Sequence, residues 1–377
     1  MAWRTRNVKD QRIEFVVAVR RREKNVSQLC QEFEISRMTG YRWLQRYRNH
    51  GVEGMEEQSR RPHHIPGRTP AAVEQRIVEL RTKRPDWGAR KLQELLRRES
   101  LGLPVGTIHR VLLRHDLVRE QDRHRPAVQR FERAAPNQLW QMDFKGPKGW
   151  DHAVGPLSVI DDHSRYATVL HSTGSTREAL VREVLEATFR DCGVPEEMLM
   201  DHGCPWWNGQ AERGWTRLSV WLMKQNIQLH FSGVRHPQTQ GKVERLNRSL
   251  TEALLRRGTP EPEQRQPWLD EFRYEYNHIR PHQALGMKTP SQFWQKSSRP
   301  YQPYPAAWIY PAGYETVPVK QYGQIQLQGK YHWVSGALAG EDVGVVIVEQ
   351  KLLIFFRRTL VRAVDLLPHA VDEAEGE

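Results

Sequence analysis

The sequence predicts a multidomain protein with two small all-α units, a central α/β domain and a small C-terminal β-barrel. The chain has 377 residues, which is more than one ordinary domain needs. Apolar residues recur at helical spacing in the first third, and short strand-like runs alternate with helical patterns from about residue 137. The last segment has only short strand-like runs at close spacing, which is typical of a small barrel.

Composition excludes several classes of protein. A hydrophobic fraction of 38% with 13 tryptophans is enough for real cores. No apolar run is long enough to cross a membrane, and the N-terminus lacks a signal-peptide core, so we expect no membrane partner and a cytoplasmic, nucleoid-associated protein. The three cysteines are an odd number without close pairing, which argues against a disulfide framework and a structural zinc site.

The positive charge is concentrated in the first third of the chain. Residues 1–135 hold 30 Lys and Arg against 17 Asp and Glu, a net charge of +13, whereas the remaining residues have a net charge of −1. This asymmetry favours a polyanionic partner, and nucleic acid is the common one. The alternative is a basic surface that serves solubility alone.

Residues 1–58 are predicted to form the first helical unit. A helix over about 9–22, a short second helix and a basic third helix after Ser36 match the helix-turn-helix pattern. In the third helix, Met38, Tyr41, Leu44 and Tyr47 are periodic and are expected to face the core. Its outward arginines are candidate DNA contacts: Arg37, Arg42 and Arg46. Small three-helix bundles without DNA have the same pattern, so that alternative stays open.

Residues 59–69 read as a basic linker, in which Arg60, Arg61 and Arg68 are candidate DNA contacts of an extended arm. A plain interdomain linker is the alternative. Residues 70–118 repeat the three-helix design, with exposed Arg110 and Arg114 as candidate DNA contacts. Residues 119–136 form a second basic connector. Two such modules in tandem suit a long DNA site.

Residues 137–300 are predicted to form the α/β domain. The expected strands cover 139–144, 156–162, 165–171, 197–201 and 227–231, and the main expected helices cover 176–191, 211–225 and 241–257. A further helix around Trp268 runs into the polar segment Tyr276–His282. Residues 301–377 carry the predicted barrel and an acidic tail.

Three carboxylates from separate elements form the candidate catalytic site. Asp143 and Asp201 lie at the ends of two predicted strands, and Glu244 lies in the first turn of a helix. Clustered carboxylates repel one another unless a cation neutralises them. Oxygen ligands suit Mg²⁺ or Mn²⁺, and two such ions about 4 Å apart catalyse in-line phosphodiester displacement. A lone Glu244 would otherwise be a capping residue.

Five motifs give the chain a family resemblance: Trp140–Lys145, Val159–Arg165, Met200–Gly203, Pro237–Asn247 and Tyr276–His282. Together they resemble the bacterial insertion-sequence transposases that share the retroviral-integrase catalytic core, and are closest to the branch with a single reading frame. The resemblance implies an RNase H-like fold with Asp143, Asp201 and Glu244 as the acidic triad. It further implies two Mg²⁺ or Mn²⁺ ions, with Asp143 bridging both.

The resemblance also implies roles for neighbouring residues and for partners. Lys242 and Arg245 match positions that contact DNA near the cleaved strand, whereas Asp161 and Asp162 are expected to be structural. Asn247 either faces the site or is a solvated polar residue. The family works as multimers, which implies a homo-oligomer, at least a dimer on DNA.

The chain departs from the family pattern in two ways. His202 follows the second aspartate where the family commonly has asparagine. It is interpreted as a tolerated substitution, although a histidine there could sense pH or bind a softer metal. The interval of 42 residues between Asp201 and Glu244 is longer than usual, and the extra length is expected as a surface loop near 205–209.

These observations support the hypothesis of a DNA transposase. It would bind the terminal inverted repeats of a mobile element, cleave at the ends and join the 3′-hydroxyl to target DNA. The rivals are a catalytically silent DNA-binding regulator, against which the intact triad argues, and an RNase H-type nuclease, which does not account for the two helical modules.

Overall fold

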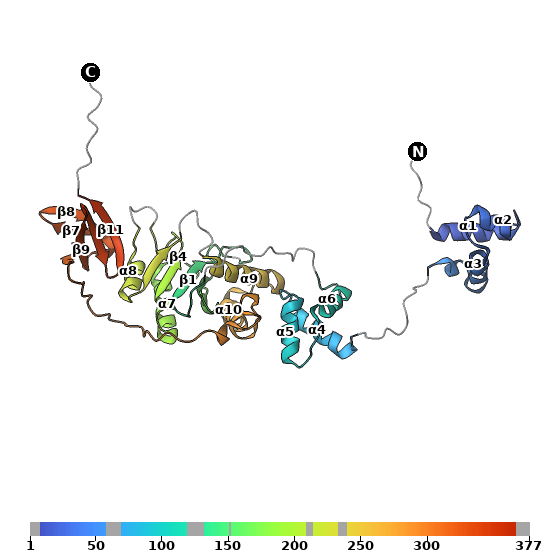
Figure 1. The fold of residues 1–377 in the computed structure, drawn as a ribbon, viewed down its shortest axis with the longest axis horizontal. Coiled ribbons are helices and arrows are strands. Elements are labelled where there is room, and N and C mark those ends of the chain that lie inside the picture. Colours follow the sequence, from blue (N-terminus) through green and yellow to red (C-terminus); the bar gives the residue numbers. More distant parts are fainter. Residues whose placement is uncertain are drawn as a thin grey trace, which may run out of the picture. The chain divides into compact units, whose positions relative to one another are not determined.

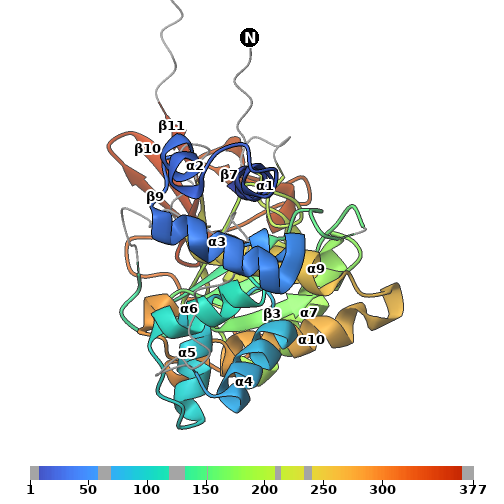
Figure 2. The same cartoon turned by 90° about the vertical axis from the view of Figure 1, so that its right-hand side faces the viewer.

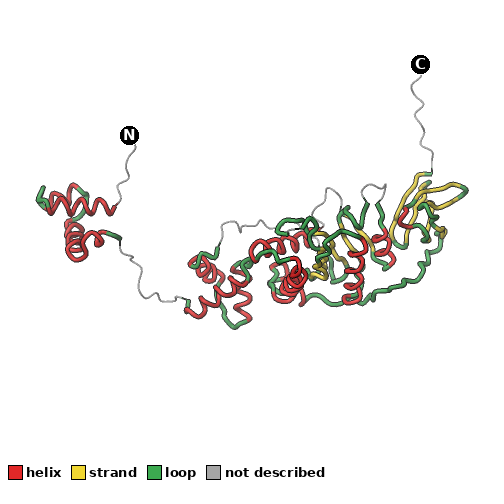
Figure 3. Tube along the Cα trace, turned by 180° about the vertical axis from the view of Figure 1, so that it is seen from behind, coloured by secondary structure: helices red, strands yellow, loops and turns green. Residues whose placement is uncertain are grey.

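The computed structural model describes residues 8–57, 69–118, 132–150, 152–208, 214–232 and 240–366 (Figure 1). The chain divides into two compact units, Met1–Arg68 and Thr69–Glu377. Helices alone build the described residues up to 118, and the strands belong to the central and C-terminal parts (Figure 3). The second helical module therefore lies in the same compact unit as the central domain.

The first unit has the predicted three helices, α1 (Val8–Arg20), α2 (Val26–Glu32) and α3 (Arg37–His50), followed by the short 3₁₀ helix η1 (Gly51–Met55). Asn25 begins α2 with a capping box to Gln28, and Ser36 caps α3 by accepting the Thr39 amide at 3.1 Å. Such side chains satisfy amides that the first helical turn leaves unpaired. The start of the third helix after Ser36, expected from the sequence, is thus confirmed.

The prediction of which side chains of α3 face the core is wrong for the first half of the helix. Met38 and Tyr41 are 82% and 60% exposed, whereas Leu44 and Tyr47 do pack against the core. The reason is Gly40, where an added Cβ would stand 2.5 Å from the sulfur of Cys30. Because α3 approaches α1 and α2 through this glycine, the neighbouring large side chains turn outward.

The second module consists of α4 (Ala71–Lys83), α5 (Ala89–Arg98) and α6 (Val105–Arg114), which form one compact group (Figure 2). Ile77, Leu92, Leu96 and Ile108 build its core around the fully buried Trp87. The predicted three-helix arrangement is confirmed.

The central domain is built on a five-stranded mixed sheet with the order β3-β2-β1-β4-β5. Its strands are β1 (Leu139–Phe144), β2 (Leu157–Asp161), β3 (Ala167–His171), β4 (Glu197–Met200) and β5 (Gln228–Phe231). The first three strands form an antiparallel meander, whereas β4 pairs with β1, and β5 with β4, in parallel. The order brings the ends of β1 and β4 side by side at one edge of the sheet.

Helices cover both faces of this sheet: α7 (Glu178–Cys192), α8 (Arg217–Lys224), α9 (Gly241–Arg257) and α10 (Arg265–Tyr274). Trp140 and Met142 of β1 join the core on the side of α7 and α8. Since side chains alternate along a strand, Gln141 and Asp143 point to the opposite face, where α9 packs. The sheet therefore aims Asp143 at the helix that carries Glu244.

The helix expected over 211–225 is shorter in the structure. Thr216 and Ser219 form a capping box that begins α8 at Arg217, and residues 209–213 lie outside the described part. The loop expected near 205–209 is described only as far as Asn208, where Trp207 forms an isolated bridge with Trp215. The capping residues thus explain the later start.

The C-terminal part forms sheets, but not the closed barrel expected from the strand spacing. The four-stranded sheet has the order β11-β10-β9-β6, and β7 and β8 form a separate hairpin. The strands are β6 (Glu315–Pro318), β7 (Gln324–Leu327), β8 (Lys330–Trp333), β9 (Asp342–Val348), β10 (Lys351–Phe356) and β11 (Thr359–Asp365). Within the described residues β6 and β11 are unpaired edges, so hydrogen bonds do not close the sheet.

The C-terminal sheets share an apolar core with the central domain. The indole of Trp215 donates to the Val361 carbonyl at 3.1 Å, and Lys224 pairs with Glu341 at 2.5 Å. Across the ranges that the structure describes, no helix combines the length and apolar character needed to cross a membrane.

Candidate active site

Asp143 occupies the end of β1 and is held by α9. The Asn247 amide donates to Asp143 Oδ2 at 2.9 Å, and the Asn247 carbonyl oxygen accepts the Ser158 hydroxyl at 2.7 Å. Asn247 therefore faces the site, which decides between the two readings left open by the sequence. Because Ser158 pairs with Asp143 across β1 and β2, the three side chains form a strand-to-helix contact.

Asp201 directly follows β4, and its local turn orients its carboxylate. Oδ1 accepts the Gly203 amide at 3.1 Å and the Trp206 indole N–H at 2.9 Å. A Cβ at Gly203 would stand 2.8 Å from Oδ1, so this close approach requires glycine. Trp206 is buried and stacks on Phe144, the residue after Asp143. The stacking of Trp206 on Phe144 thus links the turn of Asp201 to the end of the strand that carries Asp143.

Glu244 lies in the first turn of α9 and is exposed. The helix has no side-chain cap of its own at Gln240. Instead, the buried Gln141 of β1 accepts the Lys242 and Val243 amides, both at 3.2 Å. This contact satisfies two amides that a helix start leaves unpaired. It fixes the start of α9, and therefore Glu244, against the strand that carries Asp143.

The three acids interact electrostatically. Burial raises the pKa of Asp143 to about 6, and the charges of Asp201 and Glu244 add to this rise. The hydrogen bonds from Asn247 and from the Phe144 backbone oppose it. The raised pKa therefore reflects a partly buried carboxyl that also feels the charges of two other carboxylates.

The donor set and its charge suit a hard divalent cation, but the ligands are not assembled. Three carboxylates supply only oxygen donors, which Mg²⁺ and Mn²⁺ prefer. Among the described residues, no three His, Cys, Asp or Glu side chains lie close enough together to hold a metal ion. The structure brings Asp143 and Asp201 to one edge and places Glu244 on the adjoining helix.

Asp161 and Asp162 are fully buried and each is satisfied by hydrogen bonds. Asp161 accepts the Ser164 hydroxyl and amide and the Asn137 amide, at 2.5 to 2.7 Å. Asp162 accepts the Arg133 amide at 2.7 Å and the Gln141 side chain at 2.8 Å. These contacts agree with the structural role expected for the pair.

The predicted DNA contacts on α9 differ in their surroundings. The Lys242 ammonium pairs with the buried Asp162, and burial lowers the pKa of Lys242 despite that partner. Lys242 thus holds the helix start on the sheet in this arrangement. Arg245 is exposed.

The candidate arginines of the helical modules fall into two groups. Arg37, Arg42 and Arg110 are exposed on α3 and α6. Arg46 donates to the Glu56 carbonyl at 2.9 Å, and Arg114 pairs with Glu74 at 2.7 Å. Arg60, Arg61 and Arg68 lie outside the described residues.

His202 is engaged away from the carboxylates. Its Nδ1 lies 2.9 Å from the Ser232 carbonyl oxygen, and its ring contacts Trp207 and Phe231. This environment agrees with a tolerated substitution.

Sequence reasoning missed Gln141, Gly203 and Trp206 as residues that position the acids. The signal for Gln141 was present, since it stands two residues before Asp143 and must share its face of the sheet. No comparable signal points to the Trp206 indole, because its partner depends on the path of the turn.

Four regions match known domain families. Residues 11–63 match a helix-turn-helix domain, residues 39–112 a homeodomain-like domain, and residues 133–237 and 225–290 two models of the integrase core domain. Fold and matches together define an integrase-core protein with helix-turn-helix DNA-binding domains.

Two curated relatives come from insertion elements. An uncharacterized 31.7 kDa protein of insertion element IS407 from Burkholderia multivorans is 26% identical over 226 residues, which cover 58% of this chain and 79% of that protein. An uncharacterized 39.2 kDa protein of IS476 from Xanthomonas euvesicatoria is 29% identical over 248 residues, covering 61% and 67% respectively. The chain belongs to the bacterial insertion-sequence transposases with an integrase-type core.

Two solved structures are also similar. The simian T-cell lymphotropic virus intasome in complex with PP2A regulatory subunit B56 gamma matches at 15% identity and a TM-score of 0.37, over 76% of this chain and 99% of that chain. The HTLV-2 integrase catalytic core domain in complex with magnesium matches at 15% identity and a TM-score of 0.33, over 42% and 97% respectively.

Proposed function

We propose that this transposase binds the terminal inverted repeats of a mobile element, cleaves at the element ends and joins the freed 3′-hydroxyl to target DNA. The observation that supports the proposal is that β1 and β4, which lead to Asp143 and Asp201, are neighbouring strands, while Gln141 of β1 holds the start of α9, the helix that carries Glu244. The three acids come from a strand, a turn and a helix, and burial, with the charges of Asp201 and Glu244, raises the pKa of Asp143. We also propose that the central domain, with its mixed sheet and covering helices, has the RNase H-like fold that the motifs imply.

The cofactor in this proposal is a pair of Mg²⁺ or Mn²⁺ ions in each site. When bound, the ions activate the attacking hydroxyl and stabilise the leaving oxygen of an in-line displacement. Asp143, Asp201 and Glu244 would hold them. Asn247 keeps the Asp143 carboxylate in place, and the Gly203–Trp206 turn does so for Asp201. Glu244 has to approach the two aspartates to complete the site.

DNA is the proposed partner of the exposed cations. Arg37 and Arg42 lie on the third helix of the first module, the element that enters the major groove in helix-turn-helix proteins. Arg110 and Arg245 add exposed charge on α6 and beside Glu244. Arg46, Arg114 and Lys242 would have to exchange a protein partner for a phosphate. Arg60, Arg61 and Arg68 complete the proposed set, and the protein would act as at least a dimer on DNA in the bacterial cytoplasm.

The test uses a DNA duplex with the inverted repeat that flanks the gene. Wild type with Mg²⁺ is expected to nick this duplex at the element end and to join the end to a target plasmid. Asp143→Asn should abolish both steps, whereas Asp191→Asn, on the exposed surface of α7, should leave them unchanged. Full activity of Asp143→Asn would contradict the proposal. Binding without cleavage by wild type would favour a silent regulator, and sequence-independent cleavage of RNA–DNA hybrids would favour a nuclease.

A further inference from the structure

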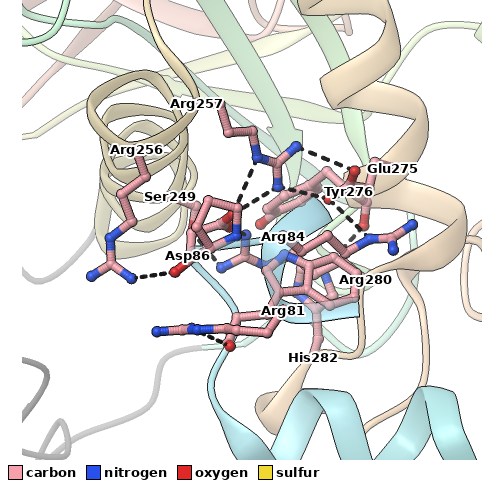
Figure 4. Close-up of polar contacts among 12 residues, drawn as sticks. Arg81, Arg84, Asp86, Ser249, Arg256, Arg257, Glu275, Tyr276, Arg280 and His282 are labelled. Atoms are coloured by element: carbon pink, nitrogen blue, oxygen red, sulfur yellow. Dashed lines mark hydrogen bonds and ion pairs between the residues drawn. The ribbon is translucent and has the colours of Figure 1, made fainter. Parts of the chain in front are cut away.

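The C-terminal end of α9 carries a buried ionic cluster that joins the second helical module to the central domain (Figure 4). Arg257 at the end of α9 donates to Asp86 Oδ1 at 2.7 Å and to Glu275 Oε1 at 2.9 Å. Its neighbour Arg256 donates to the Pro85 carbonyl at 2.7 Å. Asp86 and Pro85 belong to the turn between α4 and α5, so the contact crosses from one domain to the other.

Asp86 is the centre of the cluster. Its side chain is inaccessible to solvent, and its second oxygen accepts Arg280 Nη1 at 3.1 Å. Burial alone would raise the pKa of Asp86, but Arg257 and Arg280 hold it below its ordinary value. A buried carboxylate shared by two guanidinium groups fixes geometry strongly, because loss of Asp86 would take this charged partner from the buried Arg280, while Arg257 would keep Glu275.

Asp86, Arg257 and Arg280 form an ionic clamp between the two domains. The segment Tyr276–His282 supplies one side of this clamp. Arg280 reaches Asp86 and also Ser249 of α9, at 3.3 Å. Ile279 packs against the apolar core of the second module, and its carbonyl accepts Arg98 of α5 at 3.3 Å. Trp87, fully buried, lies under the guanidinium of Arg84, 4.9 Å from its ring centre. One short segment therefore contacts both α9 and the second module.

The same segment is anchored to the sheet. Asn277 brackets Ala167 of β3, accepting its amide at 2.8 Å and donating to its carbonyl at 3.0 Å. Tyr276 is buried in the apolar core between α9 and the sheet. These contacts give a physical role to a motif that the acidic site does not use.

We infer that Asp86 is a positioning residue for Glu244. The clamp of Asp86, Arg257 and Arg280 makes the second DNA-binding module and α9 one rigid body. This rigid body fixes where the DNA strand is cut relative to the sequence that the module binds. Helix α9 has 17 residues, a length of about 25 Å, with the clamp at its last turn and Glu244 at its first. Successive phosphates of a DNA strand are about 3.4 Å apart along the helix axis, so a small rocking of α9 changes which phosphate meets the carboxylates.

The rigid-body part of this inference is independent of the proposed function, whereas the cutting position rests on it. Spin labels on Leu113→Cys of α6 and Leu255→Cys of α9, both exposed positions, report their distance in the full chain with Cys192 and Cys204 replaced by serine. We expect one narrow distance distribution, which Asp86→Asn and Arg280→Lys broaden. Glu99→Gln removes an ion pair with Arg76 inside the second module and should leave the distribution narrow. A broad distribution in the otherwise unchanged protein would overturn the rigid body.

The second readout is the position of the cut on end-containing DNA, mapped at nucleotide resolution. Wild type and Glu99→Gln are expected to cut one phosphodiester, while Asp86→Asn and Arg280→Lys spread the cuts over neighbouring phosphodiesters at unchanged DNA affinity. A clamp needed only for stability would lower the amount of product without moving the cut. Cuts that stay at the single wild-type position in both variants would overturn the positioning role. If wild type does not cut, the proposed function fails while the distance measurement still tests the clamp.

Discussion

Replacing Asp143 with asparagine should stabilise the metal-free protein while it abolishes catalysis. The carboxyl of Asp143 titrates at about 6, against an ordinary value of 3.8, because it is partly buried and faces Asp201 and Glu244. Asparagine has the same shape without the charge. Its side-chain oxygen can still accept the hydrogen bond that Asn247 donates at 2.9 Å. The substitution therefore removes an electrostatic cost and leaves the packing unchanged.

The magnitude follows from the difference between the two pKa values. A shift of roughly two pH units corresponds to about 3 kcal/mol of folding free energy, and relaxation of the pocket reduces this to about 1–3 kcal/mol. The pKa of Asp143 is raised in the folded state. The contribution of this carboxyl to the stability of the fold is therefore fully present below pH 3.8 and is lost as the pH rises through 6. The gain of Asp143→Asn should thus be absent near pH 4 and complete at pH 8.

Thermal unfolding of the full chain in EDTA, between pH 4 and pH 8, measures this gain. Asp191→Asn on the surface of α7 serves as the matched control and should show no such gain at either pH. Adding Mg²⁺ at pH 8 should raise the melting temperature of wild type and not that of Asp143→Asn. Equal stability of Asp143→Asn and wild type at pH 8, or a difference that does not change with pH, would show that the charge of Asp143 does not destabilise the folded protein.

Three further substitutions follow from other contacts. Gln141→Leu removes the acceptor of two amides at the start of α9 and one of the donors to Asp162 Oδ1, so we expect a loss of about 2–4 kcal/mol in urea unfolding and weaker Mg²⁺ binding; an unchanged unfolding midpoint would contradict this. Burial and Arg280 lower the pKa of Lys91 to about 7, so stability is lost as the pH falls from about 10.5 through 7. Lys91→Met should raise the free energy of unfolding at pH 7 by about 1–2 kcal/mol, a value reduced because Lys91 is partly exposed to solvent. This gain should vanish near pH 10.5. Gly40→Ala places a methyl group 2.5 Å from the Cys30 sulfur and should destabilise the first unit by about 1–3 kcal/mol in circular dichroism melts, whereas Gly106→Ala, in open space on α6, should not.

The places of the three acids in their strands and helix were predictable because the signals are local. Asp143 and Asp201 each mark the end of a strand-like run, and Glu244 begins a periodic helix. Asn247 lies one helical turn from Glu244, so the helical period alone made it a candidate. The supporting contacts were less visible. Gln141 accepts two amides of α9 that are 101 and 102 residues away, and only the packing of α9 on β1 shows that it caps the helix.

Other features depended on tertiary packing that the sequence does not display. The inward face of α3 is decided by Gly40, which has no side chain to contribute to an apolar pattern. The clamp joins Asp86 to Arg257 and Arg280 across 171 and 194 residues, so the three charges look like ordinary surface residues in the sequence. Strand spacing predicts short strands in the C-terminal part but does not determine which edges pair.

The most direct test of the central claim is anomalous diffraction from crystals of the protein with a cleaved element end and Mn²⁺. We expect two manganese peaks about 4 Å apart, both in contact with Asp143, with Asp201 on one and Glu244 on the other. Both peaks should be absent in Asp143→Asn, because this carboxylate is expected to contact both ions. Manganese bound elsewhere, or an element end seated in the site without any metal on these three carboxylates, would contradict the account.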